Sequence, residues 1–417
     1  MFLDKNNMYR LPWSLNDCPI GWVEVTDVCN IQCEGCYRLN YEGHKPLEEI
    51  KEEILLLKKW RNCDCIALAG GEAILHPNIL DILQFITENR MKSMILTNGA
   101  ALTNQLLKDM KKAGLNRISF HIDSLQVRPE YNMKKKTESE INDLRYKYAE
   151  MVHKLGGITT SFGITVNKDN YEEIPMFVQW AINNIKLVNA IKFVTYRGIP
   201  VKEGIEYYVQ WKKIDIRPDS LGYTIDEGEI EKIGITSKDV YDIIKEHFPH
   251  YEANSYLGGT TDHTSLKWLI GNIIVNSKGK TFGSCGKRTM ELMQIVHHLM
   301  YGSYMLFTRR EKNGKKVFLI ALLDKSVRNA LFRFVKYVLL NPMRFFTPLN
   351  VLGVGIVQAP DILPDGRCDI CESCPDLCVY KGKFVSSCRL DEYKKFGDLL
   401  QARIVSNNEK GHQSKEN

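Results

Sequence analysis

The first two hundred residues alternate short β-branched runs with amphipathic stretches, and this alternation limits the folds that the chain can adopt. Between Gly21 and Arg197, six runs have the length and composition of strands, and helical patterns separate them. Repeated βα units of this kind build a parallel sheet covered by helices. The expected strands are residues 22–26, 65–68, 94–97, 117–122, 160–166 and 190–195, and the clearest helices are residues 46–60, 78–89 and 172–184.

Two of these strands have one polar side, which indicates what the sheet encloses. The polar sides consist of Ser119, His121 and Asp123 in one strand and Ser161, Gly163, Thr165 and Asn167 in the other. A closed eight-stranded barrel fills its interior with branched apolar side chains. Six strands with a polar inner face therefore predict an α/β fold, an incomplete (β/α)6 TIM-like barrel that holds a polar ligand. The alternative is an open sheet with one solvated face.

The alternation ends after Gly198, so the rest of the chain is divided on composition. We expect a core barrel over residues 18–200, a connecting region of unassigned role over 201–284, a cysteine-rich domain with two apolar-basic segments over 285–400, and a polar tail over 401–417. Within these regions the patterns predict a helix over 237–248 and a hairpin made of 268–275 and 281–284.

Composition excludes several classes of protein. The 417 residues include 56 Lys and Arg against 50 Asp and Glu, a net charge of +6 that does not by itself indicate a nucleic-acid partner. Residues 1–17 carry charges where a signal peptide needs an apolar stretch, so we expect a cytoplasmic protein whose twelve cysteines are reduced. The longest uncharged stretch near the C-terminus, 345–360, contains two prolines and falls short of the ~20 apolar residues of a membrane span.

The strongest chemical signal is the run Cys29, Cys33 and Cys36, which directly follows the first strand. Three thiolates on one short loop suit a cuboidal iron–sulfur cluster, in which each thiolate binds a different iron. One iron is then left without a protein ligand, and an open position is what a substrate-binding metal site needs. The alternatives are a zinc site with a fourth ligand nearby, or chance clustering.

A second signal, Gly70-Gly71-Glu72, follows the second strand. Two glycines let the backbone approach a ligand closely, and the carboxylate can accept hydrogen bonds from an ammonium group. Because both motifs follow successive strands, both are expected at the C-terminal mouth of the barrel, where βα loops build active sites.

On these motifs, residues 18–200 resemble the radical S-adenosylmethionine (radical SAM) superfamily. The resemblance implies a [4Fe-4S] cluster on the three loop cysteines, whose open iron binds S-adenosylmethionine (SAM), and a Gly70-Gly71-Glu72 turn that holds the methionine ammonium group. It implies an enzyme that reductively cleaves SAM to a 5′-deoxyadenosyl radical, using an electron donor such as a ferredoxin or flavodoxin. One departure from the family is Gly35, where many members have an aromatic residue; here the aromatic Tyr37 follows the third cysteine.

The resemblance also suggests roles for the polar inner face. Ser119, Asp123 and Asn167 look like family positions that contact the ribose and carboxylate of SAM, and Thr97 and Asn98 are further candidates. His121 shares their face and is the candidate catalytic residue that would reach substrate. The alternative for His121 is a hydrogen-bonded structural role.

A second group of cysteines lies near the C-terminus. The spacing of Cys368, Cys371, Cys374 and Cys378 partly matches a ferredoxin-type run, and the module resembles the SPASM and twitch auxiliary-cluster extensions without their full pattern. The resemblance implies a second iron–sulfur cluster, for which Cys388 and the distant Cys285 are further candidate ligands; a structural zinc site is the alternative. The remaining cysteines, Cys18, Cys63 and Cys65, are expected to be buried thiols.

The expected reaction is hydrogen abstraction from an unactivated carbon of an unidentified substrate, either a peptide or protein side chain or an apolar, lipid-like molecule. The second class is suggested by the apolar-basic segments 289–307 and 326–340. In the latter, Val327, Leu331 and Phe334 recur at helical spacing, which favours a core helix and leaves open a peripheral membrane contact. The alternative to an enzyme is a non-catalytic iron–sulfur or zinc-binding scaffold.

Overall fold

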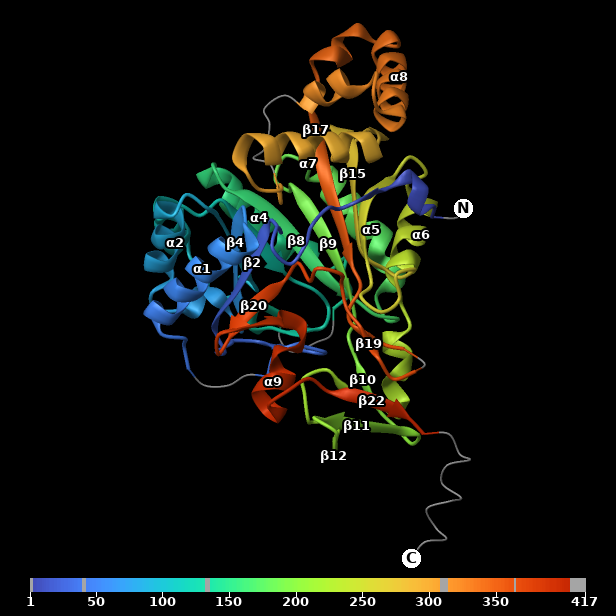
Figure 1. The fold of residues 1–417 in the computed structure, drawn as a ribbon. Coiled ribbons are helices and arrows are strands. Elements are labelled where there is room, and N and C mark those ends of the chain that lie inside the picture. The colour runs from blue at the N-terminus through green and yellow to red at the C-terminus, as the bar shows by residue number, and fades with distance from the viewer. Residues whose placement is uncertain (1–2, 40–42, 132–135, 308–313, 364, 406–417) are drawn as a thin grey trace, which may run out of the picture.

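One long sheet organises the molecule, and its first half follows the βα rhythm of the sequence. The computed structural model describes residues 3–39, 43–131, 136–307, 314–363 and 365–405. Its main sheet has the strand order β1-β14-β15-β17-β9-β8-β6-β5-β4-β2, with β16 paired to β15 (Figure 1). Six neighbouring strands are parallel and confirm the six that were predicted: β2 (Ile20–Thr26), β4 (Cys65–Gly70), β5 (Lys92–Thr97), β6 (Arg117–His121), β8 (Thr159–Val166) and β9 (Ala190–Thr195).

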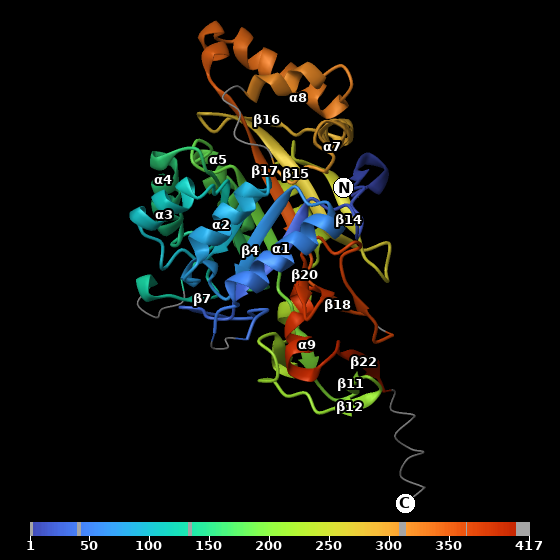
Figure 2. The same ribbon diagram turned by 60° about the vertical axis from the view of Figure 1, so that its left-hand side comes forward.

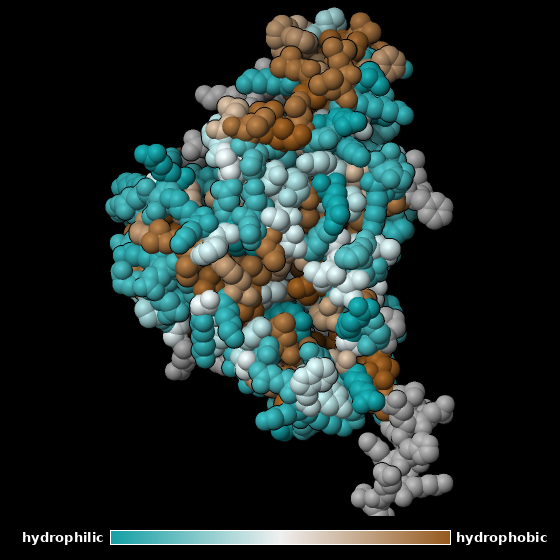
Figure 3. Space-filling view, viewed as in Figure 1, coloured by the Kyte–Doolittle hydropathy of each residue, from teal (hydrophilic) through white to brown (hydrophobic). Residues whose placement is uncertain are grey.

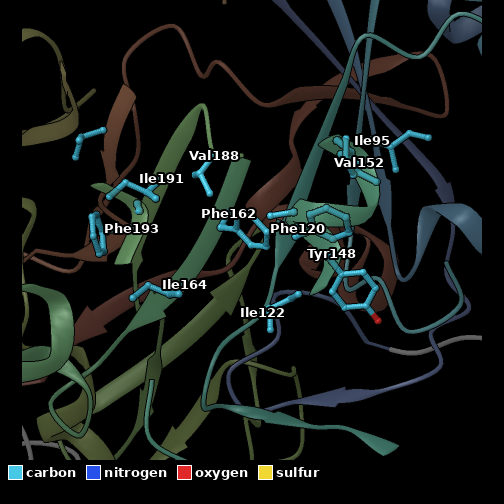
Figure 4. Packing of buried hydrophobic residues seen from close by; sticks show 14 of the residues in the cluster. Ile95, Phe120, Ile122, Tyr148, Val152, Phe162, Ile164, Val188, Ile191 and Phe193 are labelled. Carbon is cyan, nitrogen blue, oxygen red and sulfur yellow. The ribbon is translucent and has the colours of Figure 1, made fainter. Parts of the chain in front are cut away.

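Helices cover the apolar side of this parallel sheet. Phe120 of β6 stacks on Phe162 of β8 with 5.3 Å between ring centroids, and on Tyr148 of a helix at 5.1 Å (Figure 4). Burial of such side chains is the main stabilising contribution to the fold. The helices are α1 (Leu47–Arg61), α2 (Ile79–Glu88), α3 (Asn104–Lys112), α4 (Asn142–Leu155) and α5 (Ile174–Asn183), of which the first, second and fifth were predicted.

The sheet continues beyond β9 with strands that come from the far half of the chain. β17 (Leu349–Val357) pairs parallel to β9 and antiparallel to β15 (Leu266–Asn276), so the uncharged stretch 345–360 contains a central strand. The predicted hairpin of β15 and β16 (Thr281–Gly283) is confirmed, and β14 (Glu252–Gly258) and β1 (Tyr9–Arg10) complete the edge. The predicted helix is α6 (Ser237–His247), which a Thr236–Asp239 capping box begins. Within the described ranges, no helix is both long and apolar enough to cross a membrane.

The cysteine-rich segment packs against the inner side of the barrel sheet. Cys378 and Val385 share a buried cluster with Trp22 of β2 and Met94 of β5. This segment contains β18 (Asp361–Ile362), β19 (Cys368–Asp369), β20 (Leu377–Tyr380), β21 (Lys383–Ser386) and α9 (Leu390–Phe396). Below it lie β10 (Ile199–Val201), β11 (Ile205–Val209), β12 (Lys212–Ile214), β13 (Thr224–Asp226) and β22 (Gln401–Ile404) (Figures 1 and 2). β22 pairs with β11, so the first residues of the expected polar tail form a strand.

A helical lobe projects from the opposite end of the sheet, beside the start of β17 (Figure 2). The lobe consists of α7 (Lys287–Tyr301), two 3-10 segments, η6 (Gly314–Ile320) and η7 (Pro342–Phe346), and α8 (Lys325–Leu339). Here α8 buries Val327, Ala330 and Phe334 against Phe282 and Cys285, as expected for a core helix.

Candidate functional site

The carboxyl ends of the parallel strands border a cavity of about 580 Å³. Most of the residues predicted for the polar inner face line its wall: Ser119, His121 and Asp123 from β6 and its end, and Gly163 and Thr165 from β8. Cysteines of both groups also border it, so the fold brings the two ends of the chain to one chamber. The cavity cysteines are Cys29, Cys33, Cys36, Cys371, Cys374 and Cys388.

The N-terminal cysteine loop is held in place by short backbone pairings. Gln32 and Cys33 form the strand β3 (Gln32–Cys33), which pairs with β7 (Gln126–Val127) beside β6. On the other side of the loop, Asn98 Nδ2 donates to Asn30 Oδ1 at 2.8 Å. The three thiols thus face one volume from a fixed loop.

Burial raises the pKa of the Cys29, Cys33 and Cys36 thiols; repulsion from neighbouring thiolates acts in the same direction on Cys33 and Cys36, and repulsion from Glu72 does so on Cys29. Metal ligation needs thiolates, so loading this site releases protons. Among the described residues, no group of three or more His, Cys, Asp and Glu side chains is placed to hold a single metal ion. A cuboidal cluster instead spreads its thiolates over separate irons.

The two glycines after β4 are required by the neighbouring backbone. A Cβ on Gly70, whose φ is +126°, would lie 2.2 Å from the Thr26 carbonyl oxygen, and one on Gly71 would lie 2.3 Å from that of Val28. The Gly71 N–H donates to the Thr26 carbonyl at 2.8 Å. The glycines therefore let the turn pack against the start of the cysteine loop, while both still border the cavity.

Glu72 lies beneath the turn, outside the cavity lining. Its carboxylate accepts hydrogen bonds from the Asn98 N–H at 2.6 Å and from the Ile74 N–H at 3.2 Å. Burial raises the pKa of Glu72 to about 7. The side chain thus ties the turn after β4 to the turn after β5, and its contact with a methionine ammonium group stays a prediction.

His121 and Asp123 form a hydrogen-bonded pair on the cavity wall. Nε2 of His121 lies 2.8 Å from Asp123 Oδ2 and 3.0 Å from Thr165 Oγ1. Burial of Asp123 opposes ionisation, but the His121 ring and the N–H groups of Thr165 and Leu125 outweigh it and lower the pKa of the carboxyl. The His121 side chain, 39% exposed, is both hydrogen-bonded and accessible from the cavity.

The other predicted cofactor contacts divide into two groups. Thr97 and Asn98 line the cavity together with Ser119. Asn167 is buried at the end of β8 outside the lining, where its Oδ1 accepts from the Asp169 N–H at 3.0 Å. Its Nδ2 has no hydrogen-bond partner in the described part of the chain. A buried amide donor left without a partner is rare and indicates a missing ligand or water.

Three C-terminal cysteines, Cys371, Cys374 and Cys388, border the same cavity. Ser386 Oγ lies 3.2 Å from Cys374 Sγ and 3.0 Å from Cys388 Sγ. Burial raises the pKa of the Cys371 thiol, with the neighbouring Cys388 as the next cause, and the same two causes act on Cys374. Cys368 lies in β19 outside the cavity lining; burial raises the pKa of its thiol, and repulsion from Cys388 acts in the same direction.

The structure does not bring Cys285 or Cys378 to this group. Cys285 lies in the buried cluster beneath α8. Cys378 lies in the β20–β21 hairpin, where its Sγ donates to the Val385 carbonyl at 3.3 Å. Cys378 was suggested by its spacing and Cys285 as a distant candidate; the β20–β21 pairing holds the first in the hairpin, and the second is packed in the apolar cluster. The three cysteines that were expected to be buried thiols, Cys18, Cys63 and Cys65, are buried.

The cavity also contains charged residues that the sequence analysis did not identify. Lys192 and Asp376 both line it, and Lys192 Nζ lies 5.8 Å from the centroid of the Trp268 ring. Burial lowers the pKa of Lys192 and raises that of Asp376. The alternation of β9 places Lys192 on the same side as Val194, so extending the two-residue period to this strand would have found it.

A buried ion network joins the cysteine loop to α9. Arg38, two residues after Cys36, donates from Nε to Glu24 at 3.1 Å and from Nη1 to Asp391 at 3.0 Å. The same guanidinium donates to the Ser387 carbonyl at 3.0 Å. The position of the first cysteine loop thus depends on the segment that carries the second cysteine group.

Known proteins resemble the barrel part of the chain. Residues 23–181 match the family model of the Radical SAM superfamily. The probable GTP 3′,8-cyclase of Methanocaldococcus jannaschii is 25% identical over 198 residues, which cover 45% of this chain and 61% of that protein. The tungsten-containing aldehyde ferredoxin oxidoreductase cofactor-modifying protein of Pyrococcus furiosus is 26% identical over 173 residues, which cover 39% of this chain and 48% of that protein.

Among solved structures, SuiB of Streptococcus suis bound to S-adenosylmethionine aligns with a TM-score of 0.36 and 17% identity, covering 49% of this chain and 45% of that chain. The chain thus spans less than two thirds of each of these relatives.

Proposed function

We propose that the chain, whose residues 23–181 match the Radical SAM family model, is a radical SAM enzyme that abstracts a hydrogen atom from an unactivated carbon of a substrate held in the cavity. The observation that carries the proposal is the placement of Cys29, Cys33 and Cys36 on the wall of a cavity that Ser119, His121 and Asp123 also line. When bound there, a [4Fe-4S] cluster and SAM supply radical chemistry by one-electron reduction.

The residues around the cavity suit the binding of such a group. Ser119 and Asp123 present polar atoms to it, and Thr97 and Asn98 border it from the next turn. The unpaired Nδ2 of Asn167 is a donor for a cofactor oxygen at the end of β8. Glu72 acts as a positioning residue, because its carboxylate holds the Asn98 backbone.

The second cysteine group suits an auxiliary iron–sulfur cluster on Cys368, Cys371, Cys374 and Cys388. The proposal predicts that replacing Cys371, Cys374 and Cys388 by Ser lowers iron from about eight to about four atoms per chain, since each cube holds four. Cys285→Ser and Cys378→Ser are matched controls that keep all the iron. Unchanged iron with zinc lost would refute this assignment in favour of a structural zinc site.

We place a peptide or protein side chain in the cavity, whose largely apolar lining carries a few charged and polar groups. Lys192, Asp376 and Gln358 offer charge and hydrogen bonds, and His121 faces the same space. The helical lobe, whose apolar-basic segments suggested a lipid-like substrate, lies beyond the other end of β17. The nine residues of this strand span about 30 Å. A ferredoxin or flavodoxin is the proposed electron donor.

Conversion of SAM to 5′-deoxyadenosine by anaerobically reconstituted, dithionite-reduced protein tests the enzyme proposal. We expect the wild-type protein to form the product and Cys33→Ala to form none. Cys63→Ala, which alters a buried thiol outside the cavity lining, is the matched control and should retain activity. Reconstituted wild-type protein that carries its clusters but forms no 5′-deoxyadenosine would favour the non-catalytic scaffold.

A further inference from the structure

The helical lobe carries many large apolar side chains that are exposed and not packed against the rest of the described chain. We define the apolar lobe as residues 287–307 and 314–346. Of the twenty-eight large hydrophobic side chains that are exposed among the described residues, sixteen lie in this lobe. Figure 3 shows them as a brown surface over α7 and α8 at one end of the molecule. An apolar patch of this extent marks an interaction surface.

The exposed side chains are additional to those that hold the lobe on the sheet. On α8, Val327, Ala330 and Phe334 face the core, whereas Phe332 and Leu339 are 61% and 76% exposed. The helix is therefore apolar on two sides, and only one side is covered. The most exposed side chains surround it in the adjoining turns and include Leu319, Leu322, Leu323, Leu340, Met343 and Phe346.

The charge of the lobe is opposite in sign to that of the rest of the chain. Residues 287–307 and 314–346 contain nine Lys and Arg against two Asp and Glu, a net charge of +7. Since the whole chain carries +6, the remaining residues together carry −1. The lobe thus carries more net positive charge than the whole chain.

Cations lie directly beside aromatic rings of this surface. Lys315 Nζ is 4.3 Å from the centroid of the Phe345 ring, and Lys336 Nζ is 4.6 Å from that of the exposed Phe332. Basic side chains interleaved with exposed apolar ones are typical of proteins that bind a bilayer interface, where the apolar groups reach the acyl boundary and the cations meet lipid phosphates.

We propose that the apolar lobe docks the protein on the surface of an anionic phospholipid membrane. A second copy of the chain fits this surface less well, because two lobes of charge +7 would repel each other. The cavity lies about 30 Å from the lobe, at the other end of β17, so docking leaves it open for substrate. The proposal does not depend on the proposed radical chemistry.

Vesicle flotation of the anaerobically reconstituted full chain tests the proposal. The protein should float with vesicles of phosphatidylcholine and phosphatidylglycerol, and much less with phosphatidylcholine alone or at high salt. The double variant Leu319→Asp, Leu322→Asp should lower the bound fraction by about tenfold or more. Trp211→Asp, which alters a side chain 87% exposed elsewhere on the surface, is the matched control and should bind like the wild type.

Three results would overturn the proposal. The first is a wild-type protein that binds no vesicle, and the second is a double variant that floats as well as the wild type. The third is a wild-type dimer, seen by light scattering, that does not bind vesicles and that becomes a monomer in the double variant, since the lobe would then be a contact between copies. Conversion of SAM to 5′-deoxyadenosine in the double variant, compared with the wild type, separates failure of docking from failure of the proposed enzyme.

Discussion

Replacement of Arg38 by Met is expected to destabilise the protein strongly. The Arg38 side chain is 1% exposed and lies between the carboxylates of Glu24 and Asp391, which are 3% and 0% exposed. Met keeps much of the volume but removes the charge, so two carboxylates remain buried without their cation. Removing one partner of a buried ion pair costs about 3–5 kcal/mol, because the partner's desolvation is no longer compensated.

Urea unfolding followed by circular dichroism measures this loss as a lower transition midpoint at unchanged slope. The triple variant Glu24→Gln, Arg38→Met, Asp391→Asn should recover most of the stability, because no unpaired charge remains buried. Lys154→Met, in a pair with Glu150 whose side chains are 70% and 40% exposed, is a control that should change stability by less than about 0.5 kcal/mol. A loss below about 1 kcal/mol for Arg38→Met would refute the reasoning.

Two further predictions concern the barrel. Gly71→Ala should destabilise the protein by more than about 2 kcal/mol, because its Cβ would lie 2.3 Å from the Val28 carbonyl oxygen. Gly228→Ala, whose Cβ would have nothing within 4 Å, should be nearly neutral in the same unfolding assay. Equal effects of the two substitutions would contradict the proposed close approach. Burial raises the pKa of Glu53 from its ordinary 4.5 to about 7, although Lys45 opposes the shift, so the folded state holds a proton that the unfolded chain has released. The stability that this group contributes therefore falls as pH rises from about 4.5 to 7. Over that window the free energy of unfolding of Glu53→Gln relative to wild type should increase by up to about 3 kcal/mol, and above it the difference should stay constant. A difference that does not depend on pH would contradict this prediction.

The parallel half of the fold could be predicted because each of its elements is local. Strands of five to eight residues alternate with amphipathic helices. Ser119 and His121 of β6 and Gly163 and Thr165 of β8 line the cavity, as their two-residue period requires. The position of the first cysteine loop could be predicted as well, because this loop directly follows the first strand. These features need no knowledge of distant parts of the chain.

The antiparallel half could not be predicted because its partners are far apart in sequence. β17 inserts between β9 and β15, which lie about 160 and 80 residues earlier in the chain. Nothing in the composition of β17 identifies these two strands as its partners. The same limit applies to the second cysteine group. Spacing suggested Cys378 as a ligand, but the β20–β21 pairing directs its thiol to the Val385 carbonyl, while Cys388 meets Cys374 at Ser386.

Electron paramagnetic resonance of the dithionite-reduced protein, with and without SAM, tests the central claim most directly. The measurement uses the variant in which Cys371, Cys374 and Cys388 are Ser, so that any remaining signal comes from Cys29, Cys33 and Cys36. We predict the signal of a reduced [4Fe-4S] cluster whose g-values change when SAM is added, because SAM binds its open iron. A spectrum that SAM leaves unchanged, or thiols that bind no such cluster, would contradict the account.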